Sequence, residues 1–127
     1  MKQRELFVGA IVCAESPSGI CEVKEILSDH WIDTEGIRHD YERTEPIPLT
    51  PEILEKNGFE YCEAHRMYLY LDDFFDIKIR QYSDMMWEFT YCNNEINLPD
   101  TRIAGIGYVH HLQHALNMVG VEKDIII

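Results

Sequence analysis

The sequence lacks most of the motifs that mark a catalytic or metal-binding protein. Its serines lie without a G-x-S-x-G elbow, and Gly105-x-Gly107 lacks the rest of a phosphate-binding fingerprint. Cysteines are few and far apart, at Cys13, Cys21, Cys62 and Cys92, and no two form a C-x-x-C pair. These absences argue against an enzyme, and we predict no cofactor. The cysteines are most simply reduced core residues, with a metal or disulfide role as the alternative.

Long hydrophobic runs are also missing. No window approaches the roughly 18 uninterrupted apolar residues of a membrane helix. Residues 1–5 lead into only a short apolar stretch interrupted by Gly9, which is not a convincing signal peptide. We therefore expect a cytoplasmic protein with no membrane partner.

Positive charge is scarce as well. Acidic residues outnumber basic ones 23 to 11, for a net charge of −12 at pH 7. A duplex-binding protein gains affinity by neutralising phosphates with Lys and Arg, so duplex nucleic acid is not an expected partner, although one basic pocket could hold a small anion. The acidic surface favours solubility, and nucleic-acid mimicry or attraction to a basic partner is the sharper alternative.

What the chain does contain is enough apolar material for a folded core. Of its 127 residues 46% are hydrophobic and 11% aromatic, which predicts a single domain spanning residues 1–127. We predict an α+β fold in four parts. These are a β-rich N-terminal subdomain (1–48), a short helix (49–58), antiparallel strands (59–107) and a C-terminal amphipathic helix (108–120) packed on the sheet.

The first 48 residues show short strand patterns separated by sharp turns. The apolar run at 6–12 is broken by Gly9, residues 16–19 form a turn signal, and residues 20–26 alternate as in a half-buried strand. A hairpin is expected at 31–37 and a last strand piece at 41–45. This pattern favours a small SH3-like barrel or a curled meander.

The short helix has strong local start and stop signals. Thr50 is a predicted N-cap, and Pro51 occupies the first helical position, where its missing N–H costs nothing. Asn57 and Gly58 then end the helix after about two turns. Beyond it, residues 75–80 alternate apolar with charged side chains and residues 86–92 alternate aromatic with polar ones, which predicts strands with one wet face.

The last predicted helix combines an apolar seam with a polar face. Apolar residues recur along this seam at three- and four-residue steps. Gly120 can adopt the left-handed backbone conformation that ends a helix, after which Val121 folds back onto the last turn. The candidate ligand-reading residues of this segment are Tyr108, His110, Gln113 and His114. Pairs of histidines at this spacing can bind a metal, but Leu112 occupies the glutamate position of H-E-x-x-H, and we predict no metal site here. Structural hydrogen bonding of these side chains is the alternative.

Two stretches resemble a known family. I-P-L-T-P-E-I-L at 47–54 and Y-V-H-H-L-Q-H at 108–114, followed by G-V-E-K, resemble small uncharacterised proteins of gut Bacteroidetes, commonly encoded in their prophages and mobile elements. In that family the first histidine and the glutamine of the second motif are the fixed positions. The resemblance implies a phage or mobile-element origin and implies no particular activity.

The leading hypothesis is a non-enzymatic binding protein acting by sequestration or docking. One version is a counter-defence protein that traps a host nucleotide signal, with Trp87 or Tyr91 stacking on the base and Arg80 or Arg102 binding phosphate. A second version is an acidic module that binds and inhibits a host protein. The rival classes are a metal-assisted hydrolase built on the histidines and a structural or assembly component of a phage particle. Self-association into a homo-oligomer is left open.

Overall fold

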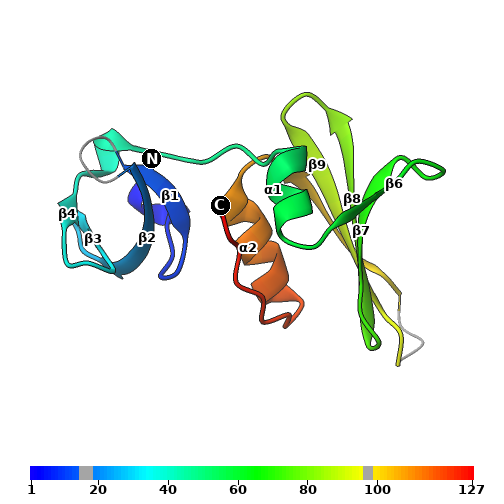
Figure 1. Cartoon of the computed structure of the whole chain (residues 1–127). Helices are drawn as coiled ribbons and strands as arrows, with labels where there is room; N and C mark the ends of the chain where they lie inside the picture. Colours follow the sequence, from blue (N-terminus) through cyan, green and yellow to red (C-terminus); the bar gives the residue numbers. More distant parts are fainter. Residues whose placement is uncertain (15–18, 96–98) are drawn as a thin grey trace. The chain divides into compact units, whose positions relative to one another are not determined.

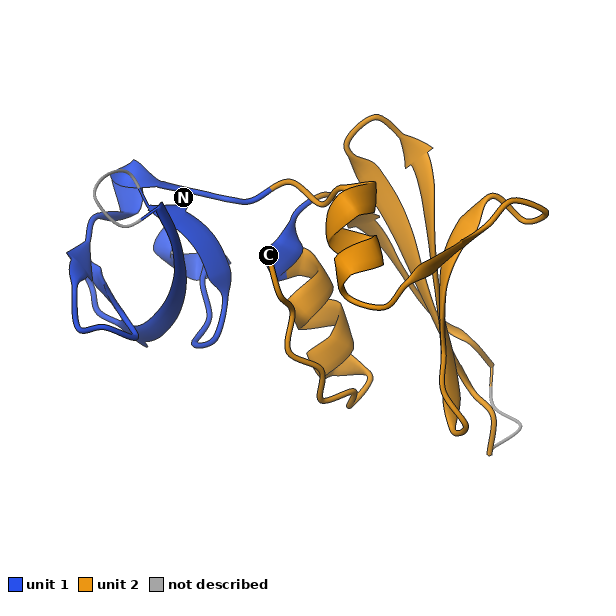
Figure 2. Cartoon of the chain, in the orientation of Figure 1, with its two compact units in different colours: residues 1–47, 108–110 blue, residues 48–107, 111–127 orange. Residues whose placement is uncertain are grey.

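The computed structural model describes residues 1–14, 19–95 and 99–127 and shows an α+β chain (Figure 1). Its strands form two antiparallel five-stranded sheets, which confirms the predicted fold class. The chain divides into two compact units (Figure 2). Unit 1 contains residues 1–47 and 108–110, and unit 2 contains residues 48–107 and 111–127. Within the described ranges, no helix is long and apolar enough to cross a membrane. The turn predicted at 16–19 lies largely outside those ranges.

Unit 1 is built on a curled sheet with the strand order β4-β3-β2-β1-β5 (Figure 1). Its strands are β1 (Ile11–Ala14), β2 (Gly19–Ile26), β3 (Trp31–Asp33), β4 (Arg38–His39) and β5 (Thr44–Glu45), and two 3-10 helices lie at Gln3–Glu5 and Tyr41–Arg43. Alternate residues of these strands face inward. The resulting core contains Leu6, Ala10, Val12, Ala14, Cys21, Val23 and Trp31.

Two predicted strand pieces of unit 1 differ from the structure. The apolar run at 6–12 is not a strand until Ile11, because Gly9 has a φ of +95° and turns the backbone while its N–H donates to the Val23 carbonyl. The piece at 41–45 begins as a 3-10 helix, since the Asp40 carbonyl accepts both the Arg43 N–H and the Thr44 hydroxyl. Only Thr44–Glu45 is strand.

Unit 2 contains the second sheet, with the strand order β10-β9-β8-β7-β6, and two helices that Figure 1 draws on the same side of it. The strands are β6 (Glu60–Cys62), β7 (Met67–Leu71), β8 (Phe75–Ser83), β9 (Met86–Asn93) and β10 (Thr101–Ile106), and the helices are α1 (Pro51–Lys56) and α2 (Val109–Met118). The first two residues of α2 belong to unit 1. Its buried apolar side chains come from the helices and from one face of the sheet; among them are Leu54, Ile77, Ile79, Trp87, Phe89, Leu112, Ala115 and Leu116.

The helix ends follow from local side-chain chemistry. The Thr50 hydroxyl accepts a hydrogen bond from the Ile53 N–H at 3.3 Å, which confirms the predicted N-cap of α1. Helix α2 ends in a Schellman motif, where the Val121 N–H donates to the Leu116 carbonyl at 2.9 Å and Gly120 has a φ of +76°.

Candidate functional site

The predicted polar residues of the α2 region do not share one exposed surface. The rings of Tyr108 and His110, which belong to unit 1, lie parallel, with centroids 5.9 Å apart and planes at 10°. His110 is only 5% exposed, whereas Gln113 is half-buried and His114 is exposed, both in unit 2. The hypothesis of a ligand-reading helix face stays a prediction, and the burial of His110 favours a structural role for that imidazole. His114 alone of these four is exposed.

Trp87 cannot stack on a ligand in this structure. Its side chain is 2% exposed, and its ring contacts Tyr68 edge-on with centroids 6.0 Å apart. Successive side chains of a strand point to opposite faces, so Trp87 lies with Phe89 on the buried face of β9. Glu88 and Thr90 lie on the other face. The nucleotide hypothesis therefore loses the tryptophan that the sequence suggested for base stacking.

The second sheet places both predicted arginines on one face, and it brings Arg102 into one cross-strand row with Lys78. Thr90 of β9 is paired with Lys78 of β8 on one side and with Arg102 of β10 on the other. Directly opposite residues have Cβ atoms about 5 Å apart, so the Lys78 and Arg102 Cβ atoms are roughly 10 Å apart and both flexible side chains can reach one anion between them. Arg80 lies two residues along the same strand. We call Lys78, Arg80 and Arg102 the basic patch.

Acidic side chains border the basic patch and limit its strength. Arg80 pairs with Glu88 at 3.9 Å, and their side chains are 53% and 29% exposed. Such a partly exposed pair at that separation contributes little binding energy. The half-buried Lys78 and the exposed Arg102 have no ion pair within 4 Å among the described residues. These two cations are the ones best placed to bind a ligand anion.

The same face carries the thiol of Cys92, which is not an activated nucleophile. Burial raises the pKa of the Cys92 thiol, and a hydrogen bond with Asp100 raises it further. A thiol must ionise to attack a substrate, so Cys92 is held in its unreactive form at neutral pH. The described side chains of this face can bind and orient an anion.

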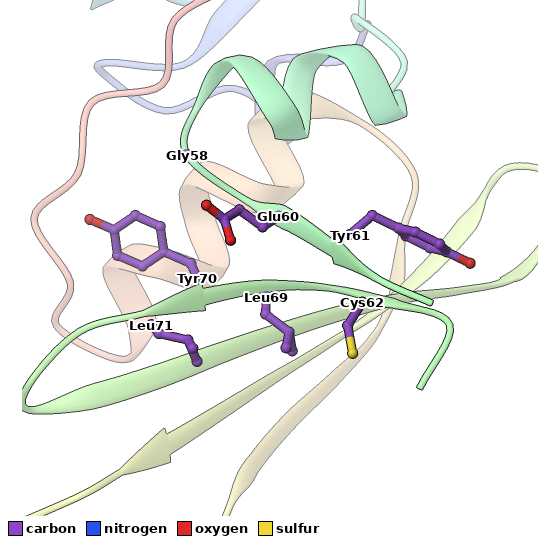
Figure 3. A pocket seen from close by; sticks show the side chains of 7 residues that line it. All are labelled: Gly58, Glu60, Tyr61, Cys62, Leu69, Tyr70 and Leu71. Carbon is purple, nitrogen blue, oxygen red and sulfur yellow. The ribbon is translucent and has the colours of Figure 1, made fainter. Parts of the chain in front are cut away.

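A depression adjoins the basic patch at the edge of the sheet (Figure 3). Its volume is about 400 Å³, and it is lined by Gly58, Glu60, Tyr61, Cys62, Leu69, Tyr70 and Leu71. In Figure 3 the side chains of Cys62, Leu69 and Leu71 leave the strands on one side and Tyr70 on the other. Leu69 is paired with Lys78 on one side and with Glu60 on the other, so a carboxylate, an apolar side chain and a cation follow one another in one cross-strand row.

Comparisons with family models, curated proteins and solved structures found no match.

Sequence reasoning missed several residues of this face. Thr90 gave no signal by itself, because only strand pairing shows that it separates Lys78 from Arg102. Tyr82 is 52% exposed, and its hydroxyl accepts a hydrogen bond from the Gly105 N–H of β10 at 3.2 Å. The sequence signal for Tyr82 was its position directly after the charged segment of a predicted strand. Tyr82 offers the exposed ring that Trp87 does not.

Proposed function

We propose that this protein is a non-enzymatic binding protein that holds a small organic anion on the outer face of its second sheet. The observation that carries the proposal is the cross-strand row Leu69, Lys78, Thr90 and Arg102. It aligns a depression with both apolar and polar lining, two cations and a hydroxyl within the reach of one small ligand. A nucleotide has matching chemistry, because its phosphate accepts hydrogen bonds from Lys and Arg while its base packs on apolar or aromatic side chains.

The biological setting forms part of the same proposal. The family resemblance supports a protein encoded by a phage or mobile element, which sequesters a host nucleotide signal in the cytoplasm as a counter-defence. The net charge of −12 supports a small ligand over a nucleic-acid polymer, because the surrounding acids repel an extended phosphate backbone. Among described residues, the absence of an ionised nucleophile beside the row supports sequestration without turnover.

Two finer features of the fold belong to this proposal. We treat the curled sheet of unit 1 as a small SH3-like barrel, supported by its five short strands and buried apolar core. We treat α2 as packed on the inner face of the second sheet, supported by its buried Leu112, Ala115 and Leu116. In that arrangement the helices cover one face of the sheet and leave the other to the ligand.

Native mass spectrometry of protein purified from its own host tests the proposal. We expect a retained small-molecule mass in the wild type and its loss in Lys78→Glu/Arg102→Glu, because the row then repels phosphate. The same variant should bind the identified nucleotide at least about tenfold more weakly in calorimetry, since charge-assisted hydrogen bonds are each worth roughly 1.5–3 kcal/mol.

A matched control removes the effect of net charge. Lys24→Glu/Arg43→Glu makes the same change in charge at two exposed positions of unit 1 and should retain the ligand. Equal losses in both variants, or no retained mass at saturating extract, would contradict the proposal.

The second candidate function is an acidic module that inhibits a host protein, and the net charge of −12 is the observation that favours it. Attraction between an acidic and a basic surface is screened by salt, with a Debye length of about 8 Å at physiological ionic strength. The association rate with such a partner should therefore fall steeply as salt rises. An association rate that does not change with salt concentration would contradict this candidate function.

A further inference from the structure

A second cluster of chemically active side chains lies in unit 1. Cys21 of β2, Asp33 of β3 and His39 of β4 come from three adjacent strands and are all buried on the inner face of the curled sheet. Val23, two residues after Cys21, is paired with Asp33, and Trp31 is paired with His39. The register therefore brings together residues that the sequence separates by 18 positions.

The three side chains direct their polar atoms at one another. His39 Nε2 lies 2.7 Å from Asp33 Oδ2 and 3.9 Å from Cys21 Sγ, and the ligand atoms of the group all lie within 4.8 Å of one another. Thiolate, imidazole and carboxylate are the ligand types that Zn²⁺ binds in proteins, usually in a tetrahedral arrangement.

Neighbouring groups hold two of these side chains in place. Asp33 Oδ1 accepts hydrogen bonds from the backbone N–H groups of Glu35 at 2.8 Å and Ile37 at 3.0 Å, which leaves Oδ2 directed at the imidazole. The Trp31 ring packs over His39 with centroids 4.4 Å apart and planes at 30°. Supporting contacts of this kind orient metal ligands in known sites.

The geometry does not suit a nucleophile–base–acid relay. Such a relay needs the nucleophile on one imidazole nitrogen and the carboxylate on the other. Here the thiol and the carboxylate both face Nε2. A single nitrogen placed between a sulfur and an oxygen matches ligands converging on a shared ion.

We propose that Cys21, Asp33 and His39 form a binding site for Zn²⁺ or a similar divalent transition metal. Ligand bonds of about 2.3 Å to sulfur and about 2.0–2.1 Å to nitrogen and oxygen imply ligand atoms roughly 3.3–3.6 Å apart in a tetrahedron. The observed 2.7 and 3.9 Å bracket that range, so movements of less than about 1 Å bring the imidazole nitrogen to bonding distance.

A fourth ligand can come from solvent. A depression of about 410 Å³ is lined by Cys21 and Asp33, with the exposed Glu22 and Glu35 also on its wall. It gives water access to the two ligands, and the carboxylates attract cations. Three protein ligands with a fourth position taken by water is the pattern of an open zinc site.

The same contacts would also serve a purely structural pair. Burial by itself would raise the pKa of Asp33, but hydrogen bonds from His39 and from the Ile37 and Glu35 backbone outweigh it, so the pKa lies below its ordinary value. A stable Asp33–His39 pair bracing the β3–β4 turn, with Cys21 as a core residue, needs no metal. A measurement of metal binding distinguishes the metal site from the purely structural pair.

Cobalt titration of the full chain, stripped of metal with a chelator, provides the test. We expect Co²⁺ to bind at one equivalent and to produce both a thiolate-to-cobalt charge-transfer band and the intense visible bands of tetrahedral cobalt. Zn²⁺ should displace Co²⁺ and remove these bands. Cys21→Ser should abolish the charge-transfer band, whereas Cys13→Ser, a change to a half-buried cysteine of β1, should retain it.

Two outcomes overturn the proposal. One is a wild-type chain that shows no tetrahedral cobalt spectrum at several equivalents, a result that needs no variant to fold. The other is a charge-transfer band that persists in Cys21→Ser and in His39→Gln, which would place the metal at another cysteine. Zn²⁺ should also raise the midpoint of thermal unfolding in the wild type and not in folded Cys21→Ser.

Discussion

Tyr41 shows how one buried side chain makes stability depend on pH. Its hydroxyl donates to the Leu27 carbonyl, with the His30 carbonyl at 3.0 Å, so the phenol connects the 3-10 helix of unit 1 to the turn between β2 and β3. Burial raises the pKa of Tyr41, and the Asp29 carboxylate raises it further. The folded state therefore favours the neutral phenol.

The stability that Tyr41 contributes should disappear at alkaline pH. A group whose pKa is raised by folding contributes fully below its unfolded value, about 10, and loses that contribution as pH rises through its folded value. Tyr41→Phe should cost about 1 kcal/mol at pH 7, through the lost hydrogen bond, and should flatten the decline above pH 10. Urea unfolding at pH 7 and 10.5 measures both effects. Tyr61→Phe, at an exposed position, is the control, and an unchanged alkaline decline in Tyr41→Phe contradicts the assignment.

Among the secondary-structure elements, the passage from β10 into α2 depends on close backbone packing. Gly107 lies between the two, and its carbonyl accepts the Leu49 N–H at 3.0 Å. A Cβ atom at Gly107 would lie 2.6 Å from the Met85 carbonyl oxygen. That oxygen belongs to the backbone of the β8–β9 turn, so it cannot move aside as a flexible side chain would.

Gly107→Ala should accordingly destabilise the protein by about 1–3 kcal/mol, the usual cost of overpacking a tight site. Chemical denaturation measures the change. Ala104→Ser, at an exposed position of β10, should stay within about 0.5 kcal/mol of the wild type. A Gly107→Ala variant as stable as the Ala104→Ser control would show that the turn moves freely.

On the scale of the whole molecule, net charge dominates the electrostatics. The described arginine ion pairs are Arg38 with Asp29 and Asp40, and Arg80 with Glu88, at 3.9–4.0 Å. Pairs of this length on partly exposed side chains contribute little. Repulsion among the excess acids of a −12 chain is the larger effect, and it opposes compaction.

Moderate salt should therefore stabilise this protein. Raising the ionic strength from about 0.01 M to about 0.15 M shortens the Debye length from about 30 Å to about 8 Å and screens the repulsion more than it weakens the few attractive pairs. The midpoint of thermal unfolding should rise over this range, with NaCl and KCl giving the same shift. A midpoint that falls would mean that attractive pairs outweigh the repulsion.

Short-range patterns were enough to predict several elements. Thr50, Pro51 and Asn57 mark the ends of α1 through contacts within one helical turn, and the structure places the helix at Pro51–Lys56. Alternation at residues 75–80 predicted which side chains are wet, and Ile77 and Ile79 are indeed fully buried. These features depend on neighbours a few residues away, so they can be inferred without a fold.

Strand register and long-range closure could be decided only by tertiary structure. Alternation predicts that Lys78 lies on the polar face of its strand, but only pairing through Thr90 brings it into one row with Arg102. Alternation likewise indicated the aromatic face of β9 without showing that Trp87 is almost fully buried there.

The composition and local periodicity of the chain by themselves determined its class, its short helix and the alternating faces of its central strands. The tertiary structure alone decided which residues that are distant in the sequence contact one another. The buried Asn57 amide, predicted only as a helix end, exchanges hydrogen bonds with the Ile126 backbone 69 residues away. Helix caps and strand alternation are set by a few adjacent residues. Long-range contacts depend instead on how the whole chain packs, and no local sequence pattern encodes that packing.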